Sequence, residues 1–196
     1  MLMGAEMAYT AKDYEKALHI YKQLKDKAAS MERRQLAKTG MLRSAHMLGN
    51  EEEIIFTATD LLADTKLAPE LSNEAHYYRA KAYLDAGKTD GAMEDLKILA
   101  KDTRNVYGAE AKYKVAQIYF DGGQTDKAEQ EVLNYIEVST PHTYWLARSF
   151  VLLSDVYVAM GKDLDARQYL LSLQQNYQGN DDIESMIEDR LKKLNK

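Results

Sequence analysis

The sequence of 196 residues contains no cysteine, only two prolines and only ten glycines. The absence of cysteine excludes disulfide bonds, thiolate metal sites and a cysteine nucleophile. The scarcity of proline and glycine favours long helices joined by short connections. No apolar run approaches the roughly 18 residues that a membrane-spanning helix needs, so direct membrane insertion is not expected.

The sequence also lacks a strong charge of either sign, with a formal net charge of −5 at pH 7. Only residues 1–50 are basic, with nine Lys and Arg against five Asp and Glu, and their lysines are spread around a predicted pair of helices. Nucleic-acid binding requires a basic stripe with stacking aromatic residues. We therefore expect no nucleic-acid partner.

The residue patterns of an active site are missing as well. The four histidines have no His or carboxylate partner at the spacing of a metal site, and no Gly-x-Ser-x-Gly nucleophile motif occurs. Neighbouring carboxylates such as Glu51, Glu52 and Glu53 stand where helices are predicted to begin, and the helix dipole explains them there. We predict a protein that is not an enzyme and that has no cofactor and no metal site.

One stretch, "AYLDAGKTDGA" (Ala82 to Ala92), comes within one residue of the phosphate-binding pattern G-x-x-x-x-G-K-[ST]. The phrase is not unique, because its tyrosine, glycine and alanine positions return at residues 119–128 and 157–166. The lysine that would hold a phosphate becomes Gln124 in the second copy. We interpret the stretch as a structural turn of an internal repeat.

Five residues occupy the turn position, at spacings of 37, 38, 36 and 38 residues: Lys12, Gly49, Gly87, Gly123 and Gly161. Each unit is long enough for two helices and two short connections. Glycine at the turn favours the left-handed backbone conformation that ends a helix. The next helix is expected to be capped by the side chains that follow, namely Thr89, Thr125 and Asp163.

Small and apolar residues recur at fixed distances from the turn position. The helix before each turn carries one of them four residues ahead, at Ala8, Ala45, Tyr83, Tyr119 and Tyr157. The helix after each turn carries them at i, i+4 and i+7, starting from Ala17, Ile54, Ala92, Ala128 and Ala166. This spacing gives each helix one apolar face, which we expect to pack against neighbouring repeats.

These columns resemble the tetratricopeptide repeat, a helix-turn-helix unit, most closely in "AKDYEKALHIYKQL" (residues 11–24) and "GQTDKAEQEVLNYI" (residues 123–136). The resemblance implies an all-α fold, a right-handed α-solenoid of about five repeats within residues 1–180. The predicted repeats cover approximately residues 1–30, 31–68, 69–104, 105–140 and 141–178. Residues 181–196 are predicted to form a C-terminal capping helix, because a solenoid needs a cover for its final core.

Two further expectations concern the setting of the chain. The apolar first helix predicts either the C-terminal part of a longer array or self-association through the N-terminal end. The repeat period, which exceeds the usual length of about 34 residues, is similar to that of bacterial envelope-associated members of the family. This similarity implies a periplasmic or envelope location in preference to a cytoplasmic one.

The resemblance implies a non-catalytic interaction module that binds a peptide or partner protein in a concave groove lined by the first helix of each repeat. The columns that face this groove hold Leu2, Glu6, Tyr9 and Thr39 near the N-terminus. Tyr and Arg frequently anchor protein interfaces, and the predicted binding residues are Arg43, His46, Tyr77, Lys81, Tyr113, Gln117 and Phe120. Tyr77 is expected beside Tyr113.

Three alternatives remain open at this point. The aromatic residues of the groove columns can instead complete the packing between repeats. The chain can be a scaffold segment of a larger multi-repeat protein, contacting partners through its ends or outer face. Glycan binding is a third possibility, because it would use exposed tyrosines and Trp145.

Overall fold

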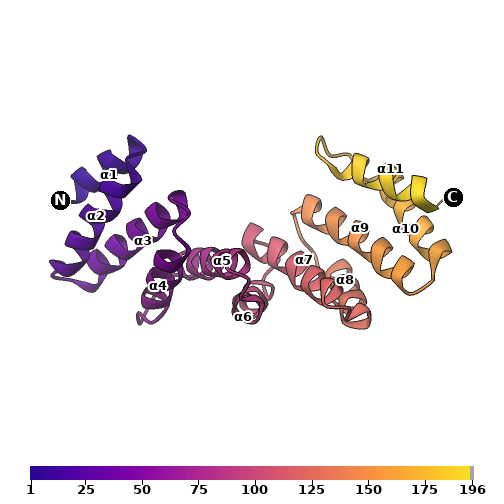
Figure 1. Ribbon diagram of the computed structural model, residues 1–196, viewed down its shortest axis with the longest axis horizontal. Helices are drawn as coiled ribbons and strands as arrows, with labels where there is room; N and C mark the ends of the chain where they lie inside the picture. Colours follow the sequence, from indigo (N-terminus) through magenta and orange to yellow (C-terminus); the bar gives the residue numbers. More distant parts are fainter. Residues whose placement is uncertain (195–196) are drawn as a thin grey trace. The chain divides into compact units, whose positions relative to one another are not determined.

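The computed structural model describes residues 1–194, which form eleven α-helices and no strand (Figure 1). The chain divides into two compact units, Met1–Asp95 and Leu96–Lys196. The first unit contains α1 (Leu2–Thr10), α2 (Tyr14–Asp26), α3 (Met31–Met47), α4 (Glu51–Leu62), α5 (Pro69–Asp85) and most of α6 (Thr89–Leu99). The second unit contains the end of α6, α7 (Val106–Asp121), α8 (Thr125–Glu137), α9 (Thr143–Ala159), α10 (Asp163–Asn176) and α11 (Ile183–Leu194).

Within each unit the helices pack as stacked hairpins. In the first unit, each helix from α1 to α4 contacts the next helix along the chain, and α3 also contacts both α1 and α5. In the second unit, each helix from α7 to α10 contacts the next helix along the chain, and α9 also contacts α7 and α11. First helices of successive pairs therefore lie side by side, which confirms the predicted all-α class of helical repeats.

The five turn positions have the left-handed backbone that the sequence predicts. Their φ angles are 62° at Lys12, 64° at Gly49, 69° at Gly87, 72° at Gly123 and 73° at Gly161. In each turn the amide of the following residue donates to the carbonyl five residues back, as from Gln124 to Tyr119 at 2.8 Å. This bond satisfies a carbonyl at the helix end that would otherwise lack a partner, so the turn motif ends each first helix in the same way.

Lys12 is the one turn residue in this set that has a side chain. A left-handed conformation costs a non-glycine residue about 1–2 kcal/mol. Glycine avoids this cost, but it loses more conformational entropy on folding than lysine does, which offsets part of the gain. We expect Lys12→Gly to raise the free energy of unfolding by about 0.5–1 kcal/mol. Gly123→Ala, with no atom near the added Cβ, should lower it by about 1 kcal/mol. Chemical denaturation of both variants measures the two changes in the free energy of unfolding. Changes of the same sign in the two variants would contradict the prediction.

The predicted caps at Thr125 and Asp163 are wrong. These residues are the first residues of α8 and α10, whose N-caps are Gln124 and Lys162 and lack a side-chain cap hydrogen bond. The cap position falls one residue earlier than predicted because it directly follows the left-handed residue. Earlier in the chain this position holds Asp13 and Asn50, and both side chains accept a hydrogen bond from the amide three residues on.

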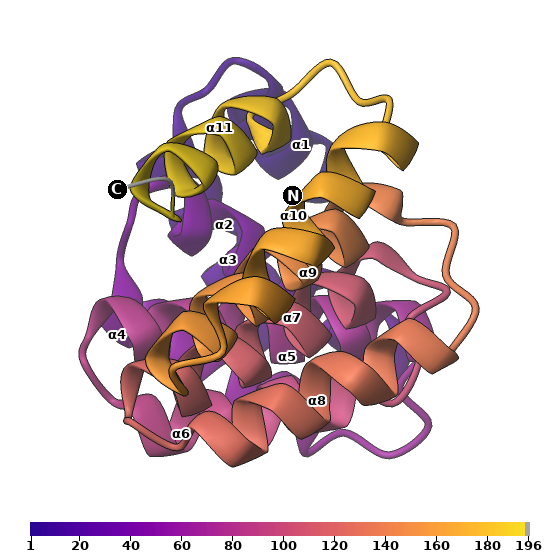
Figure 2. The same cartoon turned by 90° about the vertical axis from the view of Figure 1, so that its right-hand side faces the viewer.

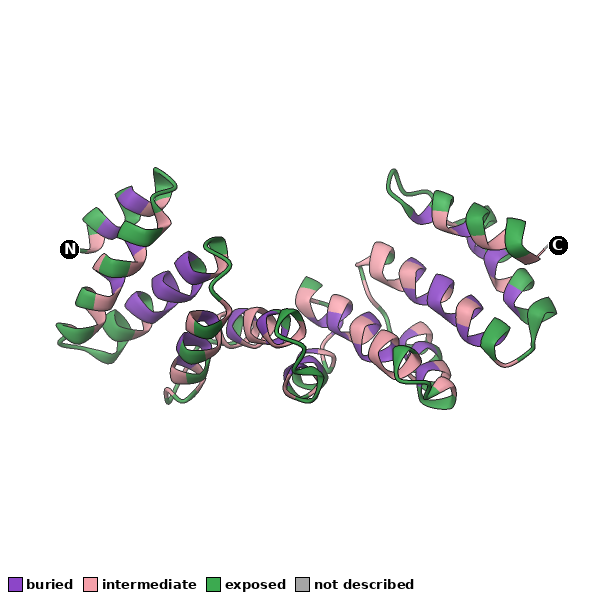
Figure 3. Ribbon diagram, viewed as in Figure 1, coloured by how far each residue is buried: buried purple, intermediate pink, exposed green. Residues whose placement is uncertain are grey.

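The predicted apolar columns form the cores of the two units. Ala17, Ala92, Ala128 and Ala166 are 0 % exposed, and Ile54 is 4 % exposed. Buried residues run along the faces of the helices that meet their neighbours, most continuously on α3 and α9 (Figure 3). Small residues in these columns let the helices approach closely, while Leu and Tyr fill the spaces between them.

The last helix, α11, packs on α9 and α10 (Figure 2). Ile183 and Ile187 are buried in the core of the second unit, and Arg190 pairs with Asp155 of α9 through bonds of 2.8 and 2.6 Å. Lys196, part of the predicted capping helix, lies outside the described residues. At the other end of the chain Met3 and Met7 are exposed on α1, and the self-contact expected there stays a prediction.

No helix within residues 1–194 combines the length and the apolar character needed to cross a membrane. The two compact units do not test the repeat boundaries proposed from the sequence, because each unit is larger than one repeat and the division falls inside α6. These boundaries stay a prediction.

Candidate functional site

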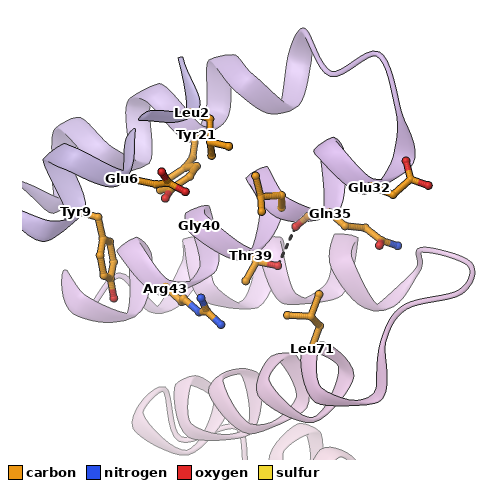
Figure 4. A pocket seen from close by; sticks show the side chains of 11 residues that line it. Leu2, Glu6, Tyr9, Tyr21, Glu32, Gln35, Thr39, Gly40, Arg43 and Leu71 are labelled. Carbon is orange, nitrogen blue, oxygen red and sulfur yellow. Dashed lines mark hydrogen bonds between the residues drawn. The ribbon is translucent and has the colours of Figure 1, made fainter. Parts of the chain in front are cut away.

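A pocket of about 340 Å³ opens in the first unit. We call it the α1–α3 pocket, and the residues that line it are Leu2, Glu6, Tyr9, Tyr21, Glu32, Gln35, Leu36, Thr39, Gly40, Arg43 and Leu71. Figure 4 shows Leu2, Glu6 and Tyr21 on one side and Thr39, Arg43 and Leu71 on the other. The lining therefore comes from α1, α2, α3 and the start of α5, which the hairpin packing brings together.

The inner wall of the pocket depends on a close contact between α2 and α3. The ring of Tyr21 packs directly on the backbone of α3 at Gly40, and a Cβ at position 40 would overlap that ring. Glycine inside a helix costs about 0.5–1 kcal/mol relative to alanine, so its presence here needs a packing reason. Gly40 makes room for an aromatic ring at a column position where the other repeats hold Ala58, Leu96, Val132 and Leu170.

Two carboxylates border the pocket without an ionic partner. Glu6 on α1 and Glu32 on α3 are both exposed, and no cation among residues 1–194 lies within salt-bridge distance of either. Hydrogen bonds from its own backbone amide and from Ser30 lower the pKa of Glu32, so this carboxylate is ionised at neutral pH. Both negative charges are available to a ligand.

Arg43 is already paired within the first unit. Its Nε and Nη2 donate to Oε1 and Oε2 of Glu74 on α5, at 2.6 and 2.7 Å, in a two-bond fork. The hydrogen bonds to Glu74 raise the pKa of Arg43, so the guanidinium stays charged. Because Glu74 neutralises Arg43, this cation does not offset Glu6 and Glu32.

The two tyrosines of the pocket keep neutral hydroxyls. Burial raises the pKa of Tyr9, and burial followed by the nearby Glu6 charge raises the pKa of Tyr21. The Tyr9 ring is also fixed by an edge contact with Tyr14, with ring centroids 5.3 Å apart. Both tyrosines therefore present aromatic surface to the pocket and carry no charge of their own.

The other predicted residues of the first unit lie on α3 and α5. His46 stacks on Tyr78 with ring centroids 4.2 Å apart, and burial lowers the pKa of this histidine. Lys81 is exposed, with its Nζ 5.4 Å from the centroid of the half-buried Tyr77 ring. The structure thus places Arg43, His46, Tyr77 and Lys81 on neighbouring first helices, and only Arg43 lines the pocket.

The predicted residues of the second unit are engaged in packing on α7. Tyr113 is 6 % exposed, and its ring lies 5.7 Å from that of Trp145 and 5.2 Å from the guanidinium of Arg148. The Tyr113 hydroxyl donates to Gln117, whose amide donates to Asp121. Phe120 packs against the same core. For these residues the structure favours the alternative that the aromatic column completes the packing between helices.

Several lining residues were not identified from the sequence, among them Tyr21, Leu36 and Leu71. The sequence contained one signal, which concerns the contact made by Tyr21. Gly40 is the one glycine in the interior of α3, and its column holds Tyr78, Lys114 and Leu152 in the later repeats. A residue that is unfavourable in a helix and present in one repeat alone indicates a local packing requirement.

Within the described part of the chain, no three histidine or carboxylate side chains come together as metal ligands. The pocket lining offers aromatic, apolar and carboxylate groups in place of a nucleophile with an adjacent base. This set of groups is suited to holding a side chain of a partner.

The comparisons with known proteins agree with this architecture. The sequence of residues 74–102 matches the tetratricopeptide repeat family. The chain therefore contains a segment that is similar to a tetratricopeptide repeat. No curated protein matches it in sequence.

Several solved structures share the fold of this chain at low sequence identity. A crystal structure of MamA protein has a TM-score of 0.70 at 17 % identity, covering 89 % of this chain and 88 % of that one. A putative kinesin light chain of Podospora anserina, with nearly identical repeats of this kind, has a TM-score of 0.61 at 19 % identity and covers 87 % and 90 %. A thermophilic tetratricopeptide-repeat protein of Thermus thermophilus has a TM-score of 0.53 at 17 % identity and covers 95 % of each chain.

Tetratricopeptide-repeat proteins are in general non-catalytic modules that bind protein partners. The matched segment and the fold are consistent with an interaction module of this general kind. The α1–α3 pocket is a concave feature of the first unit, lined by aromatic, aliphatic and charged side chains.

Proposed function

We propose that this chain holds a segment of a partner protein against α1 and α3, with a side chain of that segment seated in the α1–α3 pocket. The observation that supports the proposal is the pocket itself, which combines aromatic and aliphatic walls with a small number of polar groups. Ligand sites in proteins have this composition. The predicted groove columns contribute Leu2, Glu6, Tyr9, Thr39 and Arg43 to it.

The pocket volume suits an extended segment with one or two large side chains. Ligand pockets span about 300–1,000 Å³, and this pocket is at the small end of that range. A bound helix would need a longer apolar groove to receive side chains from successive turns. Arg43 is held in place by Glu74 and would border the bound segment.

A display selection from random peptides on the immobilised chain supplies ligands for a direct test. We expect Leu36→Arg to weaken the selected peptides at least tenfold, because it places a long charged side chain into an apolar pocket wall. Ile98→Arg is the matched control, since Leu36 is 44 % exposed and Ile98, on α6 outside the pocket, is 45 % exposed. Isothermal titration gives the affinities, and circular dichroism confirms that both variants are folded.

Equal affinities for Leu36→Arg and the wild type would contradict the pocket as the binding site. The scaffold alternative makes a different prediction, because contacts through the end of the array would involve Met3 and Met7, which are 73 % and 66 % exposed. If Met3→Glu abolishes partner binding and Leu36→Arg leaves it unchanged, the result would favour the scaffold alternative.

A further inference from the structure

The charges around the α1–α3 pocket carry information about the partner segment. The pocket is bordered by Glu6, Glu32 and the Arg43–Glu74 pair. Since Glu74 offsets Arg43, the two remaining carboxylates leave the site with a local excess of negative charge. This excess stands out because residues 1–50 are otherwise basic.

Resting on the proposed function, we infer that the bound segment carries an apolar side chain flanked by lysine or arginine. The apolar side chain fills the space between Tyr9, Tyr21 and Leu71, and the flanking cations pair with Glu6 on α1 and Glu32 on α3. The pocket lining contains aromatic and aliphatic side chains to receive the apolar group, and carboxylates to pair with the cations. An acidic segment would meet two unpaired carboxylates and would be rejected.

The position of the two carboxylates favours ionic contacts with a ligand. They stand on different helices, next to aromatic and aliphatic walls that exclude water when a side chain enters. Charges beside such a surface interact more strongly than charges in open solvent. Exposed ion pairs change an equilibrium by about 2- to 5-fold each, so two of them account for roughly a tenfold difference in affinity.

A charge-swap experiment tests the inference. The probes are the peptides selected on the wild-type chain, and analogues in which the residues that flank the apolar position are replaced by glutamine. The variant is Glu6→Gln/Glu32→Gln. The matched control is Glu15→Gln/Glu52→Gln, which removes the same charge from exposed positions on α2 and α4 outside the pocket.

We expect the selected peptides to have basic flanks and to bind about tenfold more weakly to Glu6→Gln/Glu32→Gln, with the control variant unchanged. Their affinity for the wild type should fall as salt is added, because salt screens these contacts. The glutamine analogues should bind the wild type and the double variant equally.

Selected peptides without basic flanks, or equal binding of basic peptides by the double variant and the wild type, would overturn the inference and leave the proposed function standing. The proposed function fails on a separate result, unchanged binding by Leu36→Arg. A selection that enriches no pocket-dependent peptide overturns both.

Discussion

Gly108→Ala is expected to lower the free energy of unfolding by about 3 kcal/mol, through overpacking at a tight corner and loss of a helix cap. Gly108 lies in the first turn of α7, where its amide donates to the Asn105 side chain at 2.8 Å. A Cβ at this position would overlap the carbonyl of Asp102 and approach the carbonyl oxygen of Leu99 to 2.7 Å. Because these obstacles are backbone atoms, the start of α7 has to move.

The matched control for this prediction is Gly4→Ala. Gly4 lies inside α1, and nothing stands within 4 Å of an added Cβ, so the change should be neutral or stabilise by up to about 1 kcal/mol through helix propensity. Thermal and chemical denaturation measure both variants. A Gly108→Ala protein within about 0.5 kcal/mol of wild type would show that the corner relaxes without cost.

The second large effect is expected at Asp95, which joins α6 to α5 in the interior of the first unit. Its carboxylate is 1 % exposed, accepts from Nδ1 of His76 at 2.7 Å, and is held by a fork from Arg79 at 2.7 and 2.8 Å. Arg79 also donates to Thr59 of α4 at 2.9 Å. One buried charge network thus links α4, α5 and α6.

Asp95→Ala should destabilise the chain by about 3–5 kcal/mol, because it leaves the Arg79 guanidinium largely buried without its counter-charge. Arg79→Met/Asp95→Leu removes both charges and should recover most of the loss, since apolar side chains of similar volume often replace a buried ion pair without penalty. Urea unfolding of the three proteins gives the comparison. A double variant as unstable as Asp95→Ala would show that packing, and not the unpaired charge, dominates.

The pH dependence of this network has a defined sign. Burial would raise the pKa of Asp95, but the hydrogen bonds from Arg79 and His76 outweigh it and lower the pKa below its usual value. A carboxylate with a depressed pKa in the folded state contributes stability above its unfolded pKa of about 3.9 and loses it as pH falls further. The difference in stability between wild type and Asp95→Ala should therefore shrink below about pH 4.

The fold followed from the sequence because its signals are repeated. A residue type at one position is weak evidence, but the same column in five copies identified the left-handed turns, including Lys12, and the buried columns that begin with Ala17. The cap positions were placed one residue late, because Thr125 and Asp163 are common cap residues and the true position holds Gln124 and Lys162.

The candidate site was predicted only in part. Repeat columns place Glu6, Tyr9 and Arg43 on the groove side of their helices, and the pocket lining includes all three. The columns give no information on how deeply a side chain is covered, so Tyr113 was assigned to binding although it is buried. The sequence shows that Gly40 differs from the residues of its column, but the folded structure is needed to show that Tyr21 packs against it.

The most direct test of the central claim is photo-crosslinking from inside the α1–α3 pocket. A benzophenone amino acid at position 36, irradiated with a selected peptide and mapped by mass spectrometry, should give a crosslink to the apolar residue of that peptide. The same group at position 98, on α6 and equally exposed, should give none. Crosslinks from position 98 and not from position 36 would contradict the assignment of partner binding to this pocket.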